Sequence, residues 1–188
     1  MVNPAITARV FMLVAFGSMA KQAFPIADAV SSATPLEIMA NGNTVGLKDL
    51  LLGTTGGAIG ETCAIALLIG FVYLLIRRVI TWHIPVLYVA SVYILSLFVE
   101  GFDFTKALAM ILSGGLLLGA VFMATDYVTS PSTAKGKIIF GIGVGVITFL
   151  IRYYGVYPEG VSFAILFMNI LTPYIDKMSA HKVFGGQK

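Results

Sequence analysis

The sequence predicts an all-α, polytopic membrane protein with about six transmembrane helices. Of its 188 residues, 58% are hydrophobic and only 11% are charged, whereas a soluble domain has about 45–50% apolar and about 25% charged residues. The mean hydropathy is +0.93. The one cysteine, Cys63, allows neither an intrachain disulfide nor a multi-cysteine metal site. No cluster of Lys and Arg indicates nucleic-acid binding, so we expect helices that pack against one another in lipid.

Each predicted span is an apolar stretch. We compared its length with the about 20 residues that a helix needs to cross the hydrocarbon core. The stretches are 6–24, 58–76, 84–100, 106–124, 138–155 and 160–176. The second, fourth and fifth have the required length, and the third and sixth are slightly short. The first has only a modest apolar centre, because Arg9 and Lys21 bracket it.

The spans divide the chain into four predicted regions and orient it. The regions are a first transmembrane helix at 1–24, an external loop at 25–57, a five-helix transmembrane repeat at 58–176 and a cytoplasmic tail at 177–188. With a cytoplasmic N-terminus, eight Lys and Arg residues fall inside and four fall outside. This distribution follows the positive-inside rule, so the 25–57 loop should face the exterior.

Two acidic residues are candidates for an ion path, because an ionisable residue at membrane depth marks a functional site by default. Glu61 follows a glycine-rich stretch, 56–60, and such a break suits a discontinuous helix whose backbone lines a cavity. Asp126 lies at the end of the fourth span. The alternative for Glu61 is an interfacial cap or salt bridge. The alternative for Asp126 is that it merely lies where the span ends and a cytoplasmic loop begins.

Other glycines are interpreted as sites of close helix packing, since small residues let helices approach in lipid. They are Gly141, Gly143 and Gly145, together with Gly119 and the 113–115 Ser-Gly-Gly segment. The 141–145 run is not a dinucleotide-binding fingerprint, because it lies inside an apolar helix rather than after a strand. Arg152 is expected to pair with an acid or to extend its charge toward water.

Several motifs, in the same order along the chain, resemble one family. They are Asn3-Pro4-Ala5, Ser31-Ser32-Ala33-Thr34-Pro35-Leu36, Gly56-Gly57-Ala58-Ile59-Gly60-Glu61-Thr62, Arg77-Arg78-Val79 with Trp82 and Pro85, Phe122-Met123-Ala124-Thr125-Asp126, Thr129-Ser130-Pro131, Tyr157-Pro158-Glu159-Gly160-Val161 and Met168-Asn169. The chain resembles the D subunit of the Rnf-type ion-translocating electron-transport complex. It is also similar to the B subunit of the sodium-translocating NADH:quinone reductase, and it looks like the C-terminal half of the longer family protein.

The resemblance implies a cofactor. In the family, FMN is esterified through its phosphate to a threonine that matches Thr34, and Asp28, Ser31 and Ser32 belong to the same motif. Ser32 stands where the family usually has glycine. An external flavin transferase would modify Thr34, and a second, non-covalent flavin such as riboflavin is also implied. Instead of pairing with an acid, Arg152 could neutralise the negative charge of the flavin phosphate. From the residues alone, Thr34 could equally be part of a loop or the N-cap of a helix.

The resemblance also implies a fold and a role. The architecture would be part of an inverted-repeat bundle in a bacterial or archaeal cytoplasmic membrane. The chain would serve as a translocase subunit, with other membrane and peripheral subunits, in a complex that exchanges electrons between ferredoxin and NAD while moving sodium ions or protons. Two other classes remain open: a passive channel or solute transporter, and a structural membrane anchor. The sequence identifies neither the ion nor the direct electron donor and acceptor.

Overall fold

A computed structural model describes residues 2–16, 34–41, 43, 45–57, 60–155 and 160–180. These ranges contain helices and no β-strand, which confirms the all-α fold class. The described helices are α1 (Pro4–Ala15), α3 (Pro35–Ala40), α4 (Leu47–Leu52), α5 (Ala64–Ile76), α6 (His83–Val99), α7 (Phe104–Leu112), α8 (Leu116–Leu118), the π-helical turn η1 (Gly119–Met123), α9 (Ala134–Tyr154) and α10 (Val161–Ser179).

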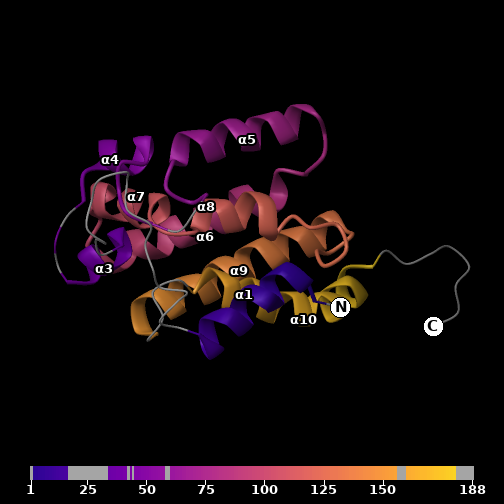
Figure 1. The fold of residues 1–188 in the computed structure, drawn as a ribbon. Coiled ribbons are helices and arrows are strands. Elements are labelled where there is room, and N and C mark those ends of the chain that lie inside the picture. Colours follow the sequence, from indigo (N-terminus) through magenta and orange to yellow (C-terminus); the bar gives the residue numbers. More distant parts are fainter. Residues whose placement is uncertain are drawn as a thin grey trace, which may run out of the picture.

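The longer helices lie roughly side by side (Figure 1). Helix α9 packs along α6 and along α10, and α1 packs on α10. Helix α5 forms the upper edge of the view in Figure 1 and contacts the rest through α4 and α8. The short helices α3 and α4 lie at the left-hand end, and the chain start lies toward the right-hand end. The bundle thus has two ends, which we name the Thr34 end and the Asp126 end after the residues described below.

Polar caps explain where three helices begin. The Asn3 side chain accepts hydrogen bonds from the backbone of Ala5 and Ile6 at the start of α1, and Thr133 caps α9 in the same way. Asp103 caps α7, and hydrogen bonds from the Thr105 hydroxyl and the Lys106 backbone hold the pKa of its carboxyl below the ordinary value. Such caps satisfy backbone N–H groups that have no partner inside the helix.

Glycines bring α6 and α9 into close contact. A Cβ atom on Gly141 would lie 3.2 Å from the Ile84 carbonyl oxygen, and one on Gly145 would lie 3.0 Å from the Tyr88 carbonyl oxygen and collide with the Ser91 side chain. The predicted packing role of these two glycines is therefore confirmed. Across the same interface, the Tyr88 and Thr148 hydroxyls share a buried hydrogen bond of 2.8 Å.

We expect Gly145→Ala to destabilise the protein by about 1–3 kcal/mol, the usual cost of overpacking a close contact. The backbone carbonyl of Tyr88 cannot move aside without shifting α6. Gly143→Ala is the matched control on the same helix, because its added Cβ would meet only the flexible end of Met168. Thermal unfolding in detergent measures both variants. Equal stability of the two would contradict the packing argument.

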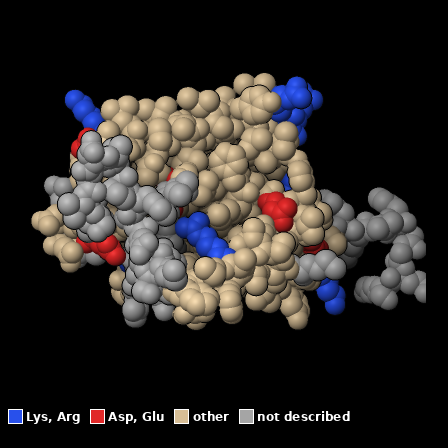
Figure 2. Space-filling view, in the orientation of Figure 1, with Lys and Arg blue, Asp and Glu red and all other residues tan. Residues whose placement is uncertain are grey.

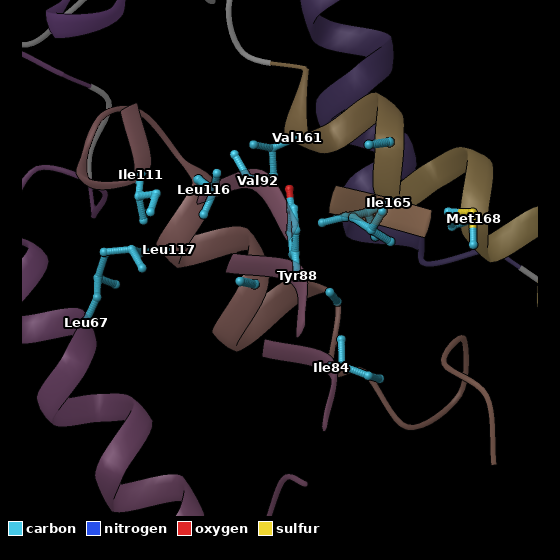
Figure 3. Packing of buried hydrophobic residues seen from close by; sticks show 14 of the residues in the cluster. Leu67, Ile84, Tyr88, Val92, Ile111, Leu116, Leu117, Val161, Ile165 and Met168 are labelled. Atoms are coloured by element: carbon cyan, nitrogen blue, oxygen red, sulfur yellow. The ribbon is translucent and has the colours of Figure 1, made fainter. Parts of the chain in front are cut away.

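Apolar residues of α1, α4, α5, α6, α7, α8, η1, α9 and α10 form one core. Figure 3 shows Tyr88 of α6 among side chains of α8 and α10, between Leu116 and Ile165. All three residues are fully buried. This core fixes the position of α8, which begins just after the interruption of the helix at 113–115.

The described helices differ in how well they match the predicted spans. Only α9 is long and apolar enough by itself to cross a membrane, and the bent pair of α7 with α8 and η1 passes the same test as a unit. Helices α1, α5 and α6 are apolar but shorter. The six-span count therefore stays a prediction.

The surface of α5 is apolar along its length. Ile69, Val72 and Ile76 are all more than half exposed. In Figure 2 the top of the molecule, where α5 lies in Figure 1, is tan and turns blue at its right-hand end. Arg77 and Arg78 directly follow α5 in the chain. An apolar helix surface that ends in basic residues is the pattern expected of a lipid-facing helix.

Candidate functional site

The apolar stretch 106–124 contains a helix break. Helix α7 ends at Leu112, α8 begins at Leu116, and the two halves are bent by 63°. Gly114 has a φ of +63°, a conformation that glycine adopts without steric cost. Gly114 therefore turns the chain, a role that the sequence analysis did not assign to it. The predicted close packing is present at both Gly114 and Gly119, because an added Cβ would collide with Leu36 of α3 at the first and with Val161 of α10 at the second.

Arg152 of α9 supplies hydrogen bonds to this break. Its Nη1 atom donates to the Met110 carbonyl at 2.5 Å, and its Nη2 atom donates to the Ser113 carbonyl at 3.1 Å. Carbonyls at a helix end have no intrahelical partner, and lipid offers them no water. The guanidinium thus stabilises the end of α7, a role that the sequence did not suggest.

Thr34 is the N-cap of α3. The Glu37 backbone N–H donates to Thr34 Oγ1 at 3.4 Å, and the Thr34 backbone N–H donates to Glu37 Oε2 at 3.1 Å. This reciprocal pair is a capping box, with Pro35 at the first helical position. The helix N-cap interpretation of Thr34 is confirmed. The cap leaves the Thr34 hydroxyl available for modification, because among the described contacts its oxygen accepts one long hydrogen bond and donates none.

One pocket brings Thr34 together with Glu61. Gly56 and Gly57 form part of its wall, as the sequence predicted for a cavity-lining glycine stretch, and Gly114 of the helix break adds another part. The hydroxyl-bearing residues Thr55 and Thr62 also line it. The attachment motif, the glycine stretch and the helix break therefore meet at the Thr34 end of the bundle.

Glu61 is buried beside the break. It is 7% exposed, and its Oε2 atom lies 3.6 Å from Arg9 Nη2 of α1. A Cβ atom on Gly115 would lie only 2.9 Å from the same carboxylate oxygen. Glu61 therefore contacts the residue that immediately precedes α8, and the positive dipole end of a half-helix favours a carboxylate at that position. The predicted salt bridge of Glu61 is present, and it lies inside the protein rather than at its surface.

Asp126 lies at the other end of the same half-helix, three residues after η1. Its Oδ2 atom accepts hydrogen bonds from the Thr129 hydroxyl at 3.0 Å and from Asn3 Nδ2 at 3.3 Å. The buried Thr172 hydroxyl of α10 donates to the Thr129 carbonyl. The structure does not bring the two candidate acids together. It places the segment 116–123, about 12 Å of helix, between them.

Three other predicted motif residues, Asp28, Ser31 and Ser32, lie outside the described residues. Two arginines contact the site in ways that the sequence did not suggest, Arg9 through Glu61 and Arg152 through backbone carbonyls. Arg9 is 52 positions from Glu61 in the chain, and Arg152 is 39 from Ser113, so no local pattern could have linked them.

The residues present fit the attachment point of a phosphate-linked flavin. Thr34 is half-buried and lines the pocket. The pocket has a volume of about 30 Å³, room for one or two waters. A flavin ring does not fit a cavity of this size, so the pocket itself has room at most for the phosphoester link at Thr34.

These features define the class of protein: an all-helical, membrane-type bundle in which a broken helix separates two acidic residues. One of these acids, Glu61, lines the same pocket as Thr34. Over residues 1–185 the chain matches the model of the NQR2, RnfD, RnfE family. The chain belongs to this family, whose Rnf members are membrane-associated.

Relatives that match it are components of electron-transfer complexes. The D subunit of the Na(+)-translocating ferredoxin:NAD(+) oxidoreductase complex of Acetobacterium woodii is 45% identical, over 100% of this chain and 60% of the relative. The proton-translocating counterpart of Clostridium ljungdahlii is 41% identical, over 99% of this chain and 62% of the relative. The D subunit of the ion-translocating oxidoreductase complex of Stutzerimonas stutzeri is 36% identical, over 97% and 63%. The chain thus spans less than two thirds of the length of each.

Proposed function

We propose that this chain is a membrane flavoprotein subunit of a complex that couples electron transfer of the ferredoxin/NAD type to sodium or proton translocation. The relatives' names support the complex and the ion coupling. The observation that carries the site is the shared pocket, where the Thr34 hydroxyl and the buried Glu61 carboxylate meet beside the helix break. Thr34 would carry FMN there, at the outer face of the membrane.

The covalent step would join Thr34 Oγ1 to the phosphate of FMN. The hydroxyl oxygen would attack the flavin-side phosphorus of a flavin dinucleotide bound to a flavin transferase, and the hydroxyl proton would pass to a base on that enzyme. The phosphoester bond to Thr34 would form as the phosphoanhydride bond of the dinucleotide breaks, and the nucleoside monophosphate would leave. Once bound, the flavin supplies the redox chemistry, and the protein supplies its position. The Thr34 backbone stays anchored by the Glu37 carboxylate through the capping box.

The ion path would run past Glu61 and Asp126 at the two ends of segment 116–123. A carboxylate that is buried and paired can exchange its partner for a proton or a cation, which is what ion transfer requires. Electron transfer drives such an exchange only where the redox state changes the affinity for the ion. Glu61 lines the same pocket as the proposed flavin anchor, so a change of charge on the tethered flavin would act on the carboxylate electrostatically.

The remaining expectations belong to the same proposal. Other membrane and peripheral subunits would bring electrons to and from this chain in a bacterial or archaeal cytoplasmic membrane. A second flavin such as riboflavin would be held without a covalent bond.

The test is ion uptake by the assembled complex in liposomes. With reduced ferredoxin and NAD, the wild-type complex should take up sodium ions or protons, and Thr34→Val should abolish uptake while the complex still assembles. Solute flux without any redox partner would instead identify a channel. Uptake that is intact in Thr34→Val would refute the role of the tethered flavin. Uptake that also survives replacement of Glu61 and Asp126 by their amides would identify this chain as a structural anchor.

A further inference from the structure

The Arg9–Glu61 pair joins a peripheral helix to the helix break. Arg9 lies on α1, and its side chain is 26% exposed, while that of Glu61 is only 6% exposed. Both lie against Gly115: a Cβ atom there would be 2.9 Å from Glu61 Oε2 and 3.6 Å from Arg9 Nη2. The absence of a side chain at Gly115 therefore leaves the space that the ion pair occupies.

The pair is held by charge more than by a short hydrogen bond. The separation of 3.6 Å exceeds the about 2.7–2.9 Å of a tight charge-assisted hydrogen bond. A buried carboxylate nevertheless requires a positive partner or a proton, because an unpaired buried charge is strongly destabilising. A cation that reaches Glu61 can therefore take over from Arg9 the neutralisation of the carboxylate.

Helix α1 is built so that Arg9 can withdraw. Ile6 is the one buried residue of α1, and the apolar side chains of Phe11, Met12 and Val14 are exposed. Helix α1 packs chiefly on α10, and its Asn3 cap contacts Asp126. Because Ile6 is the one residue of α1 in the buried core, a shift of α1 would disturb less of the core than a shift of α6 or α10. Such a shift would be felt at both candidate acids of the ion path.

We propose that Arg9 is a built-in counter-cation for Glu61, which leaves the carboxylate when a transported monovalent cation or proton binds there and returns when it departs. The proposal rests on the proposed function, since it assumes that ions pass Glu61. Two basic side chains of the described residues lie near the Glu61 carboxylate and the pocket, Arg9 from α1 and Arg152 behind Gly114. Arg152 donates to two carbonyls at the break, whereas Arg9 faces the carboxylate itself. Arg9 is therefore the residue that competes with the transported ion for the Glu61 carboxylate.

The first experiment measures redox-driven uptake by the assembled complex in liposomes at varied Na⁺ concentration and at varied pH. Arg9→Gln removes the competing charge, so the Na⁺ concentration for half-maximal uptake should fall about tenfold, or the pH profile should move upward by about one unit if the proton is the ion. Arg9→Lys keeps the charge and should stay near the wild type. Lys106→Gln, in an exposed pair with Asp103 at 4.0 Å, is the control for a general change of charge.

A second experiment needs no loss of charge, so it covers the case in which Arg9→Gln does not assemble. In the Arg9→Lys complex, modification of position 9 by an amine reagent is followed by peptide mass spectrometry. Added Na⁺, or a lower pH, should accelerate the modification by several-fold relative to Lys106 in the same sample, and Glu61→Gln should remove this dependence.

The two hypotheses fail in different ways. An unchanged half-maximal concentration and pH profile in Arg9→Gln, with Glu61→Gln altering them, overturns the role of Arg9 and leaves the proposed function standing. If the amine reagent modifies position 9 at a rate that depends neither on Na⁺ nor on pH, the role of Arg9 is likewise overturned and the proposed function stands. An unaltered ion dependence in Glu61→Gln overturns the proposed ion path and the counter-cation with it.

Discussion

Thr34→Val should abolish the covalent flavin of this chain while the helices stay folded. Valine has the shape of threonine without the hydroxyl, so no phosphoester can form. Its cost to the fold is the loss of one N-cap hydrogen bond, about 1 kcal/mol. The measurement is flavin fluorescence of the denatured protein band after coexpression with a flavin transferase, where the wild-type band should fluoresce and the variant band should not.

Three further variants separate chemistry from folding. Thr34→Asn keeps a good N-cap for α3 but has no hydroxyl, so it should also lose the fluorescence. Thr55→Val and Thr62→Val remove other hydroxyls of the same pocket, and both should keep it. A fluorescent Thr34→Asn band, or a dark Thr55→Val or Thr62→Val band in a folded protein, would assign the flavin to another residue.

Arg152→Met should destabilise the protein by about 3 kcal/mol or more, because methionine leaves the Met110 and Ser113 carbonyls without their charged donor. The carbonyls lie at a helix break inside a membrane-type bundle, where water cannot easily replace the guanidinium. Since Leu112 and Gly114 of the break line the Thr34 pocket, flavin attachment should fall together with stability. Thermal unfolding in detergent and band fluorescence measure the two effects on one preparation.

Arg152→Lys distinguishes the proposed geometry from a need for positive charge alone. An ammonium is a compact point donor and cannot reproduce the planar fork of the guanidinium, so Arg152→Lys should lie between the wild type and Arg152→Met. Lys106→Met, at an exposed basic residue, should have little effect. Full stability of Arg152→Met would show that the break does not depend on these hydrogen bonds.

Properties that depend on composition and on local pattern could be predicted from the sequence. Apolar runs predicted helices near 84–100, 138–155 and 160–176, where α6, α9 and α10 lie. The small residues at Gly141 and Gly145 predicted a close helix contact, because a glycine inside an apolar helix has few other uses. The hydroxyl of Thr34 before Pro35 also indicates a helix start, which the capping box bears out.

The helix break could not be predicted in the same way. The segment 113–115 consists of small residues, which suit close packing and a bend in the chain equally well. The bend depends on the positive φ of Gly114, which cannot be inferred from the residue types. Arg152 donates to two backbone carbonyls, a group that every residue has, so a search for an oppositely charged residue does not find these partners. Arg9 shows in the sequence only as a charge that interrupts an apolar span, because Glu61 becomes its neighbour through the fold alone.

Mass spectrometry of the intact chain decides whether Thr34 carries FMN through a phosphoester. The chain is purified from membranes of a host that expresses a flavin transferase, then weighed whole and after proteolysis. We expect an added mass of one FMN less one water, located on the peptide that contains Thr34. An unmodified chain, or an adduct on a peptide without Thr34, would contradict it.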